Sequence, residues 1–269
     1  MTFRHSKEEA ELSTHFNRLA GMNDVGHSDA GWPQSAAVFG ASGGIGSALC
    51  EALAERGIKR IFAGSRKGKA VAAHHAVPFA FDLTDEDSIE AAAEKMRDDP
   101  PQLVVVATGA LTLPDGTGPE RSYKRLDPAA MEEVLRLNTI GPALIAKHML
   151  PLFPRQGRAV FAVLSARVGS ISDNRIGGWH SYRASKAALN MLVRNWAIEL
   201  GRTHKDAVVV SLHPGTVDTA LSEPFQSGLP SGQLTPPEDA AANLLRVIDG
   251  LVPEQSGGCY DWKGERVPE

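Results

Sequence analysis

The chain has 269 residues, of which 42% are hydrophobic and 22% are charged, a balance that is ordinary for a soluble globular protein. A formal net charge of −4 gives no electrostatic reason to expect nucleic acid or an anionic membrane as a partner. The chain has no apolar run near the ~18 residues of a spanning helix, no signal-peptide pattern and too few cysteines for a disulfide framework. We therefore expect a cytoplasmic protein.

Residues 1–34 differ in composition from the rest of the chain. They combine scattered charges with a run rich in Gly, Asn, Asp and Ser that ends at Gly31-Trp32-Pro33. Only residues 8–19 are typical of a short helix. We interpret 1–34 as an N-terminal extension that is flexible or lies on the surface, and 35–269 as one domain.

From Ser35 onward, strand and helix patterns alternate, which is typical of βαβ units and a parallel sheet. The predicted strands are 36–39, 60–63, 78–81, 103–107, 158–164, 207–212 and 257–261. Four helices are predicted. The first spans 45–56, and the second runs from a capping box at 84–87 to residue 96. The third follows the cap Asp127-Pro128, and the fourth contains Tyr182. We expect a single-domain α/β fold, a Rossmann-type doubly wound parallel sheet with helices on both faces.

A glycine-rich turn separates the first predicted strand from the first predicted helix. Glycine allows a tight turn and lets a pyrophosphate approach the backbone, and the helix that follows offers free N–H groups. A flexible Gly/Ser loop is the plainer reading, but the strand before and the helix after favour dinucleotide binding. The expected cofactor contacts in this turn are Gly40, Ser42, Gly43, Gly44, Ile45 and Gly46.

The end of the second predicted strand indicates which dinucleotide is bound. An acidic residue about 20 positions after the glycine turn usually binds the ribose of NAD, yet residues 60–69 contain neither Asp nor Glu. That strand instead ends at Ser65-Arg66, where a guanidinium and a hydroxyl suit a 2′-phosphate. NADP(H) is therefore favoured over NAD(H), with a solvated basic loop as the alternative interpretation.

Tyr182 and Lys186 are four residues apart, so a helix places the phenol and the ammonium on one face. An unperturbed phenol has a pKa of about 10, and a nearby cation lowers that pKa. Such a pair can act as a general acid or base on a carbonyl or alcohol oxygen. The same spacing also occurs on many solvated helix faces, so its meaning depends on the upstream glycine turn.

Taken together, residues 35–262 resemble the short-chain dehydrogenase/reductase family. Within that family, 107–111 and 165–186 resemble the bacterial branch related to C-factor-type cell-signalling proteins. The resemblance rests on motifs in the family's order: Gly40-x-x-x-Gly44-x-Gly46, Asp82-Leu83, Ala107-Thr108-Gly109-Ala110, Asn138, Ser165, Tyr182-x-x-x-Lys186 and Pro214-Gly215-x-Val217-x-Thr219.

The resemblance implies a catalytic set of four residues. Tyr182 would exchange a proton with the substrate, and Lys186 would hold the nicotinamide ribose and lower the tyrosine pKa. Ser165 would hydrogen-bond the reacting oxygen, and Asn138 would take part in a water-mediated proton relay to the lysine. The further cofactor contacts that the resemblance implies, besides Tyr182 and Lys186, are Asp82, Leu83, Thr108, Gly109, Ala110, Pro214, Gly215, Val217 and Thr219.

Asn138 lies in the predicted helix four residues before Pro142, which has no N–H to donate back to the Asn138 carbonyl. Gly141 and Pro142 together also favour a kink. A carbonyl left open in this way takes another partner such as an ordered water. We hypothesise that Pro142 keeps this acceptor free for the relay.

These residues predict an NADP(H)-dependent oxidoreductase that acts on a small-molecule carbonyl or alcohol, as a homodimer or homotetramer and without a metal. The alternative is a catalytically weak dinucleotide-binding regulatory or signalling protein of the same fold. Trp179, Phe225 and Leu229 predict an apolar substrate pocket, and the residues around the loop 223–237, interpreted as a lid, show no basic cluster that would anchor a carboxylate or phosphate.

Overall fold

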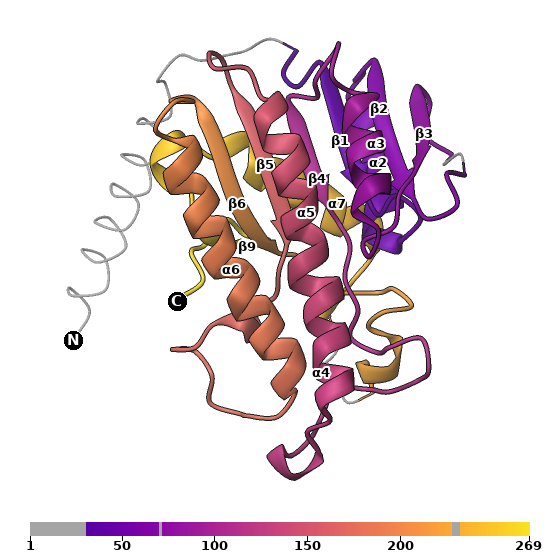
Figure 1. Ribbon diagram of the computed structural model, residues 1–269, viewed down its shortest axis with the longest axis vertical. Helices are drawn as coiled ribbons and strands as arrows, with labels where there is room; N and C mark the ends of the chain where they lie inside the picture. The colour runs from indigo at the N-terminus through magenta and orange to yellow at the C-terminus, as the bar shows by residue number, and fades with distance from the viewer. Residues whose placement is uncertain (1–30, 70–71, 228–231) are drawn as a thin grey trace, which may run out of the picture. The chain divides into compact units, whose positions relative to one another are not determined.

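The computed structural model describes residues 31–69, 72–227 and 232–269, so the predicted helix at 8–19 lies outside the described residues. Residues Pro33–Glu269 form one compact unit. Its centre is a seven-stranded sheet in the order β3-β2-β1-β4-β5-β6-β9, with every pair of neighbours parallel (Figure 1). The strands are β1 (Ser35–Phe39), β2 (Arg60–Ser65), β3 (Ala76–Ala80), β4 (Leu103–Val106), β5 (Ala159–Leu164), β6 (Ala207–His213) and β9 (Cys259–Asp261). The predicted doubly wound parallel sheet is confirmed.

Helices cover both faces of the sheet, and Figure 1 shows α5 and α6 in front of it and α7 behind it. The helices are α2 (Gly44–Glu55), α3 (Glu86–Glu94), α4 (Pro128–Leu135), α5 (Gly141–Met149), α6 (His180–Leu200) and α7 (Pro237–Gly250). The remaining strands, β7 (Thr216–Val217) and β8 (Leu234–Thr235), form a separate two-stranded pair. All seven predicted strands and all four predicted helices of the domain are present, with ends that differ by a few residues.

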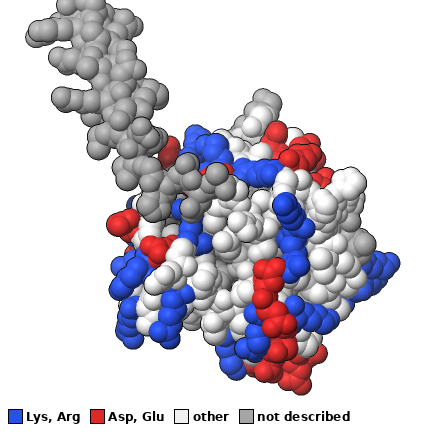
Figure 2. All heavy atoms as spheres, turned by 90° about the horizontal axis from the view of Figure 1, so that it is seen from above, with Lys and Arg blue, Asp and Glu red and all other residues white. Residues whose placement is uncertain are grey.

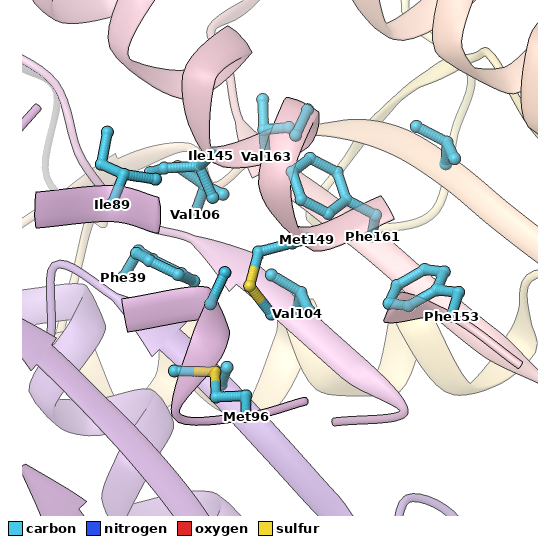
Figure 3. Packing of buried hydrophobic residues seen from close by; sticks show 14 of the residues in the cluster. Phe39, Ile89, Met96, Val104, Val106, Ile145, Met149, Phe153, Phe161 and Val163 are labelled. Atoms are coloured by element: carbon cyan, nitrogen blue, oxygen red, sulfur yellow. The ribbon is translucent and has the colours of Figure 1, made fainter. Parts of the chain in front are cut away.

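The largest core cluster fills the space between the sheet and α3, α5 and α6. Phe39 of β1, Ile145 of α5 and Met149 of α5 are completely buried in it (Figure 3). Each strand of this central region is buried on both faces, as the continuous apolar runs predict for a parallel sheet. The core thereby fixes the strand ends from which the functional residues project.

Local signals in the sequence set several helix ends. Asp127 Oδ1 accepts a 2.8 Å hydrogen bond from Ala130 N, which confirms the predicted cap of α4. Gly57 follows α2 with φ +80°, the left-handed conformation expected after a helix. The predicted capping box of α3 is wrong, because Asp85 stands at the N-cap without a side-chain bond. Thr84 instead donates through N and Oγ1 to Asp82 Oδ1.

The predicted kink before Pro142 is a π-helical turn over Arg136–Ile140, between α4 and α5. Gly141 N donates to Arg136 O, five residues back, which widens the helix at this point. Pro142 lies in the first turn of α5, directly after the π-helical turn, and has no N–H to donate back to Asn138 O. Whether the Asn138 carbonyl binds a water stays a prediction.

The surface offers no large area of one charge sign on the face shown in Figure 2, where basic and acidic side chains are interspersed over the described atoms. Among the described residues, no helix combines the length and the apolar character needed to cross a membrane.

Candidate active site

The glycine turn is shaped by backbone packing that excludes side chains. Gly40 has φ +99°, and a Cβ there would lie 2.6 Å from Ala107 O at the end of β4. A Cβ on Gly46, in the first turn of α2, would overlap the Gly40 carbonyl oxygen. Gly43 N donates a 3.0 Å hydrogen bond to that same oxygen. The turn is therefore a fixed cradle at a helix N-terminus, which fits a dinucleotide pyrophosphate.

The residues predicted to select the cofactor lie at the end of β2 and directly after it. Ser65, the last residue of β2, is 4% exposed, and its Oγ has no hydrogen-bond partner among the described residues. The pKa of Asp82 is lowered, mainly by hydrogen bonds from Thr84 and further by the positive charges of Arg66 and Arg136. An unpaired buried hydroxyl followed in the chain by an exposed arginine fits a ligand that supplies oxygen atoms here.

In the middle of the site, Asn138 connects the segment after β4 to α6. Asn138 Oδ1 accepts from Ala110 N at 2.7 Å, and its Nδ2 donates to Ala110 O at 2.8 Å and to Ser185 Oγ at 3.2 Å. A Cβ on Gly109, which has φ +152°, would lie 3.0 Å from Asn138 Oδ1 and 3.5 Å from Lys186 Nζ. The Asn138 side chain thus clamps the segment after β4 against α6. Thr108 Oγ1 in this segment is buried without a partner among the described residues.

Lys186 is buried within the first turns of α6, with 3% of its surface exposed. Its Nζ donates a 2.9 Å hydrogen bond to Leu164 O at the end of β5 and lies 5.8 Å from the centroid of the Tyr182 ring. Burial lowers the Lys186 pKa to about 8. The pair predicted from the four-residue spacing is therefore brought together on one face of the helix.

The lowered pKa that the spacing predicts for Tyr182 is not present in this structure. Burial raises the pKa of Tyr182 to about 12, because the phenolate would lose its hydration. The Tyr182 hydroxyl has no hydrogen bond to any described residue, and Tyr182 lines a cavity of about 910 Å³. The phenol is thus an open donor that faces a space where a substrate can lie.

Ser165, directly after β5, does not point its hydroxyl at Tyr182. Its Oγ donates a 2.7 Å hydrogen bond to Asn190 Oδ1, one turn beyond Lys186 on α6. Asn190 is a site residue that sequence reasoning missed. Its position four residues after Lys186 on the same helix is the signal that would have placed it on this face.

The segment after β6 packs across the glycine turn and the end of the sheet. A Cβ on Gly44 would lie 2.6 Å from Thr219 Cγ2, so Thr219 contacts the turn directly. Gly215 has φ +80° and packs on the Trp262 ring, and Val217 pairs with Thr235 in the small β7–β8 pair. Leu83, another predicted cofactor contact, packs on Gly141 of α5. Of the predicted contacts after β6, Thr219 is the one that lies against the glycine turn.

A cavity of about 910 Å³ opens beside Tyr182, and its lining includes Leu111, Leu113, Val134 and Phe225. The Trp179 ring stands edge-on to both Tyr182 and Phe225, with centroids 6.2 and 5.2 Å apart. These contacts agree with the predicted apolar pocket, whereas Leu229 lies outside the described residues.

The sequence predicts no basic cluster around the loop 223–237. In the structure, Arg121 and Arg125 of the segment between β4 and α4 line the same cavity as Tyr182 and as Phe225 of that loop. Basic side chains from a distant part of the chain therefore do lie beside the loop. No three His, Cys, Asp or Glu side chains in the described part of the chain gather as a metal site would require.

Residues 34–229 match the family model for short chain dehydrogenases, and this range carries the glycine turn, Ser165, Tyr182 and Lys186. The chain is a member of the short-chain dehydrogenase family. This dehydrogenase is thereby an oxidoreductase of a family that uses NAD(P).

Two curated relatives and one solved structure resemble this dehydrogenase. The chain is 39% identical to the C-signal of Myxococcus xanthus over 53% of this chain and 81% of the relative. It is 36% identical to 1-hydroxy-2-glutathionyl-2-methyl-3-butene dehydrogenase of Rhodococcus sp. (strain AD45), over 82% of this chain and 92% of the relative. The structure of NADPH-bound carbonyl reductase from chicken fatty liver superimposes with a TM-score of 0.74, at 26% identity over 88% of this chain and 94% of that one.

Proposed function

We propose that this dehydrogenase transfers a hydride between NADP(H) and a carbonyl or alcohol substrate, with Tyr182 as the general acid and base. The observation that carries the proposal is the open Tyr182 hydroxyl in the wall of a 910 Å³ cavity, with the Lys186 ammonium 5.8 Å from the ring centroid. A proton donor beside a ligand-sized space is what carbonyl reduction requires of the protein. The nicotinamide, when bound, supplies the hydride.

In the direction of reduction, the Tyr182 hydroxyl gives its proton to the carbonyl oxygen as that oxygen gains negative charge. A pKa near 12 keeps the phenol protonated at neutral pH, which suits a donor. In the direction of oxidation, Tyr182 acts as a base and takes the proton of the alcohol, which requires the phenolate form. The positive charge of Lys186 stabilises that phenolate. The buried Lys186 is held by Leu164 O, so its charge stays close to the ring. Ser165 lies directly after β5, where its Oγ donates its one proton to Asn190 Oδ1 and keeps its lone pairs free to accept a hydrogen bond from an alcohol substrate.

Arg66 and Ser65 support the choice of NADP(H) over NAD(H). The Ser65 hydroxyl is buried and unpaired among the described residues, and Arg66 contributes positive charge next to it. A 2′-phosphate would satisfy both groups, whereas the diol of NAD would leave the guanidinium without an anion. The printed description of the chicken carbonyl reductase as NADPH-bound agrees with this choice.

The alternative function is a dinucleotide-binding signalling protein with little turnover, and the specific observation in its favour is the similarity to the Myxococcus C-signal. In this structure the Ser165 hydroxyl donates to Asn190 and not to Tyr182. Burial also raises the Tyr182 pKa, so the phenolate form is disfavoured. The two functions differ in whether Tyr182 is needed for a reaction.

We propose in addition that the protein is cytoplasmic and assembles as a homodimer or homotetramer. Met191 and Ile198 of α6 are 62% and 49% exposed and lie seven residues apart on one helix face. An exposed apolar stripe on a long helix is suited to pairing with a second copy of the same helix.

The experiment that tests the reaction follows NADPH oxidation with a panel of aldehydes, ketones and quinones, comparing the wild type with Tyr182→Phe. We expect Tyr182→Phe to lower kcat by at least about 100-fold, the usual contribution of a positioned general acid. Fluorescence titration of NADPH should show unchanged binding. Binding without turnover of any carbonyl would favour the signalling alternative, and equal turnover in both proteins would exclude Tyr182 as the acid.

Cofactor choice is tested with Arg66→Leu. We expect KM for NADPH to rise at least about tenfold with KM for NADH unchanged, because a charge-assisted phosphate contact is lost. Lys69→Leu, a charge removed from an exposed position in the same loop, serves as the matched control. An equal rise for both cofactors would show that Arg66 acts on the common part of the dinucleotide or on folding.

A further inference from the structure

The cavity beside Tyr182 contains two acidic and two basic side chains, and their partners differ. Glu120 caps α6, since its carboxylate accepts hydrogen bonds from Ser181 N and Ser181 Oγ. Burial raises the pKa of Glu120, but these bonds outweigh it, and the net pKa is lowered. Asp127 caps α4 through Ala130 N. Both carboxylates are thus held by backbone and hydroxyl donors.

Arg121 and Arg125 line the same cavity, and neither guanidinium has a hydrogen bond or an ion pair with any described residue. Arg183 nearby offers a contrast, because its guanidinium donates to Gly178 O and Val168 O. Cap hydrogen bonds do not remove the carboxylate charges, so the lining carries two negative and two positive side chains. Of these, the exposed Arg121 and Arg125 are the ones without a partner among the described residues, and each guanidinium has about five N–H donors to offer a ligand.

Arg121 and Arg125 are close neighbours in the chain. Both belong to the segment between β4 and α4, which lies at the lower edge of the sheet in Figure 1, on the side of the α6 N-terminus. Arg125 ends the short 3-10 turn Tyr123–Arg125, which Ser122 caps. Apolar side chains of Leu111, Leu113 and Phe225 complete the lining. The cavity thus combines an apolar lining, a proton donor and two free guanidinium groups.

Resting on the proposed function, we infer that the physiological substrate carries an anionic group, a carboxylate in the first instance, which Arg121 and Arg125 hold while Tyr182 contacts the reacting oxygen. The volume of about 910 Å³ is at the upper end of ligand pockets, roughly 300–1,000 Å³, and leaves room for a substrate longer than a simple aldehyde. Guanidinium groups bind carboxylates and phosphates through paired, charge-assisted hydrogen bonds. The same chemistry would accept a phosphate ester, so the test includes one.

The test compares NADPH-dependent reduction of 4-formylbenzoate, 4-formylphenyl phosphate and the neutral methyl 4-formylbenzoate. The variants are Arg121→Gln, Arg125→Gln and the double variant, with Lys124→Gln as control. Lys124 is exposed in the same segment but does not line the cavity, and its ammonium lies 6.0 Å from the Tyr123 ring centroid. We expect the double variant to raise KM for the anionic aldehydes at least about tenfold and to leave kcat and KM for the ester within about twofold. Added salt should raise KM for the anions only.

Several results would overturn the inference while leaving the proposed function intact. These are equal changes for ester and anions, the same loss in Lys124→Gln, or a wild-type preference for the ester. A selective loss for one anion supports the inference and identifies that anion as the better match.

If the wild type reduces none of the three aldehydes, the proposed function fails in this panel and binding decides the inference separately. Isothermal titration of 4-formylbenzoate into the NADP⁺-loaded protein should then show binding that the double variant loses. Absent binding, or equal binding by wild type and double variant, would overturn the inference.

Discussion

At the scale of single residues, the hydroxyl groups of the site differ in whether they have a hydrogen-bond partner within the protein. Ser165 is matched to Asn190 by a 2.7 Å bond, whereas the Tyr182 hydroxyl has no bond to a described residue. A buried hydroxyl that loses its acceptor costs about 1–3 kcal/mol, so the Ser165–Asn190 pair stabilises the end of β5 against α6. Asn190 is thus a positioning residue for Ser165.

A double-mutant cycle tests this pair. We expect Asn190→Leu to lower the free energy of unfolding by about 1–3 kcal/mol, because the Ser165 hydroxyl is left without an acceptor. The same change in a Ser165→Ala background should cost less than half as much. Urea unfolding measures both, and Asn190→Asp, which keeps an acceptor oxygen, is the control. Additive costs would show that the two side chains do not interact.

At the scale of elements, the glycine turn and the first turn of α2 form one unit. Alanine is normally the better helix residue by about 1 kcal/mol. At Gly46, however, a Cβ would overlap the Gly40 carbonyl oxygen, while at Gly43 the nearest atom would be 3.4 Å away. Backbone packing therefore overrides helix propensity at Gly46. Gly43 is instead the N-cap of α2, with extended backbone at φ −82° and ψ 162°, so helix propensity does not apply to it.

We predict different outcomes for alanine at these two positions. Gly46→Ala should lower the free energy of unfolding by about 1–3 kcal/mol, the range for overpacking. Gly43→Ala should lower it by less than about 1 kcal/mol, because no atom clashes there and only the N-cap preference for glycine over alanine is lost. Chemical unfolding of the two variants without cofactor gives the comparison. A stable Gly46→Ala protein would mean that α2 shifts away from the turn at little cost.

At the scale of the whole molecule, the parallel sheet collects the carboxyl ends of its strands at one edge, the lower edge in Figure 1. The predicted site residues follow the strands at that edge: 40–46 after β1, 107–110 after β4, Ser165 after β5 and 214–219 after β6. Helix α6 also begins there, with Tyr182 in its first turn. Ligands of open α/β sheets bind at this edge, because the connections splay apart there. On α6, Met191 and Ile198 are exposed among the described residues.

Assembly is tested on that surface. We predict a dimer or tetramer for the wild type and a lower mass for the Met191→Asp, Ile198→Asp double variant, since buried carboxylates are costly in an apolar interface. Ile176→Asp, at a residue that is 90% exposed on a loop, is the matched control. Light scattering after size exclusion measures the mass. A monomeric wild type, or an unchanged double variant, would contradict the proposal.

The sequence by itself determined the parallel sheet, the glycine turn and the pairing of Tyr182 with Lys186, because apolar runs, glycines and helical spacing act through local geometry. It did not determine the Ser165–Asn190 bond or the two arginines in the cavity. Those contacts join residues far apart in the chain, and only the packing of β5 on α6 and of the 111–127 segment beside Tyr182 decided them. The same holds for the Tyr182 pKa. The sequence identifies the nearby lysine, which would lower that pKa, but burial, a property of the tertiary structure, raises it.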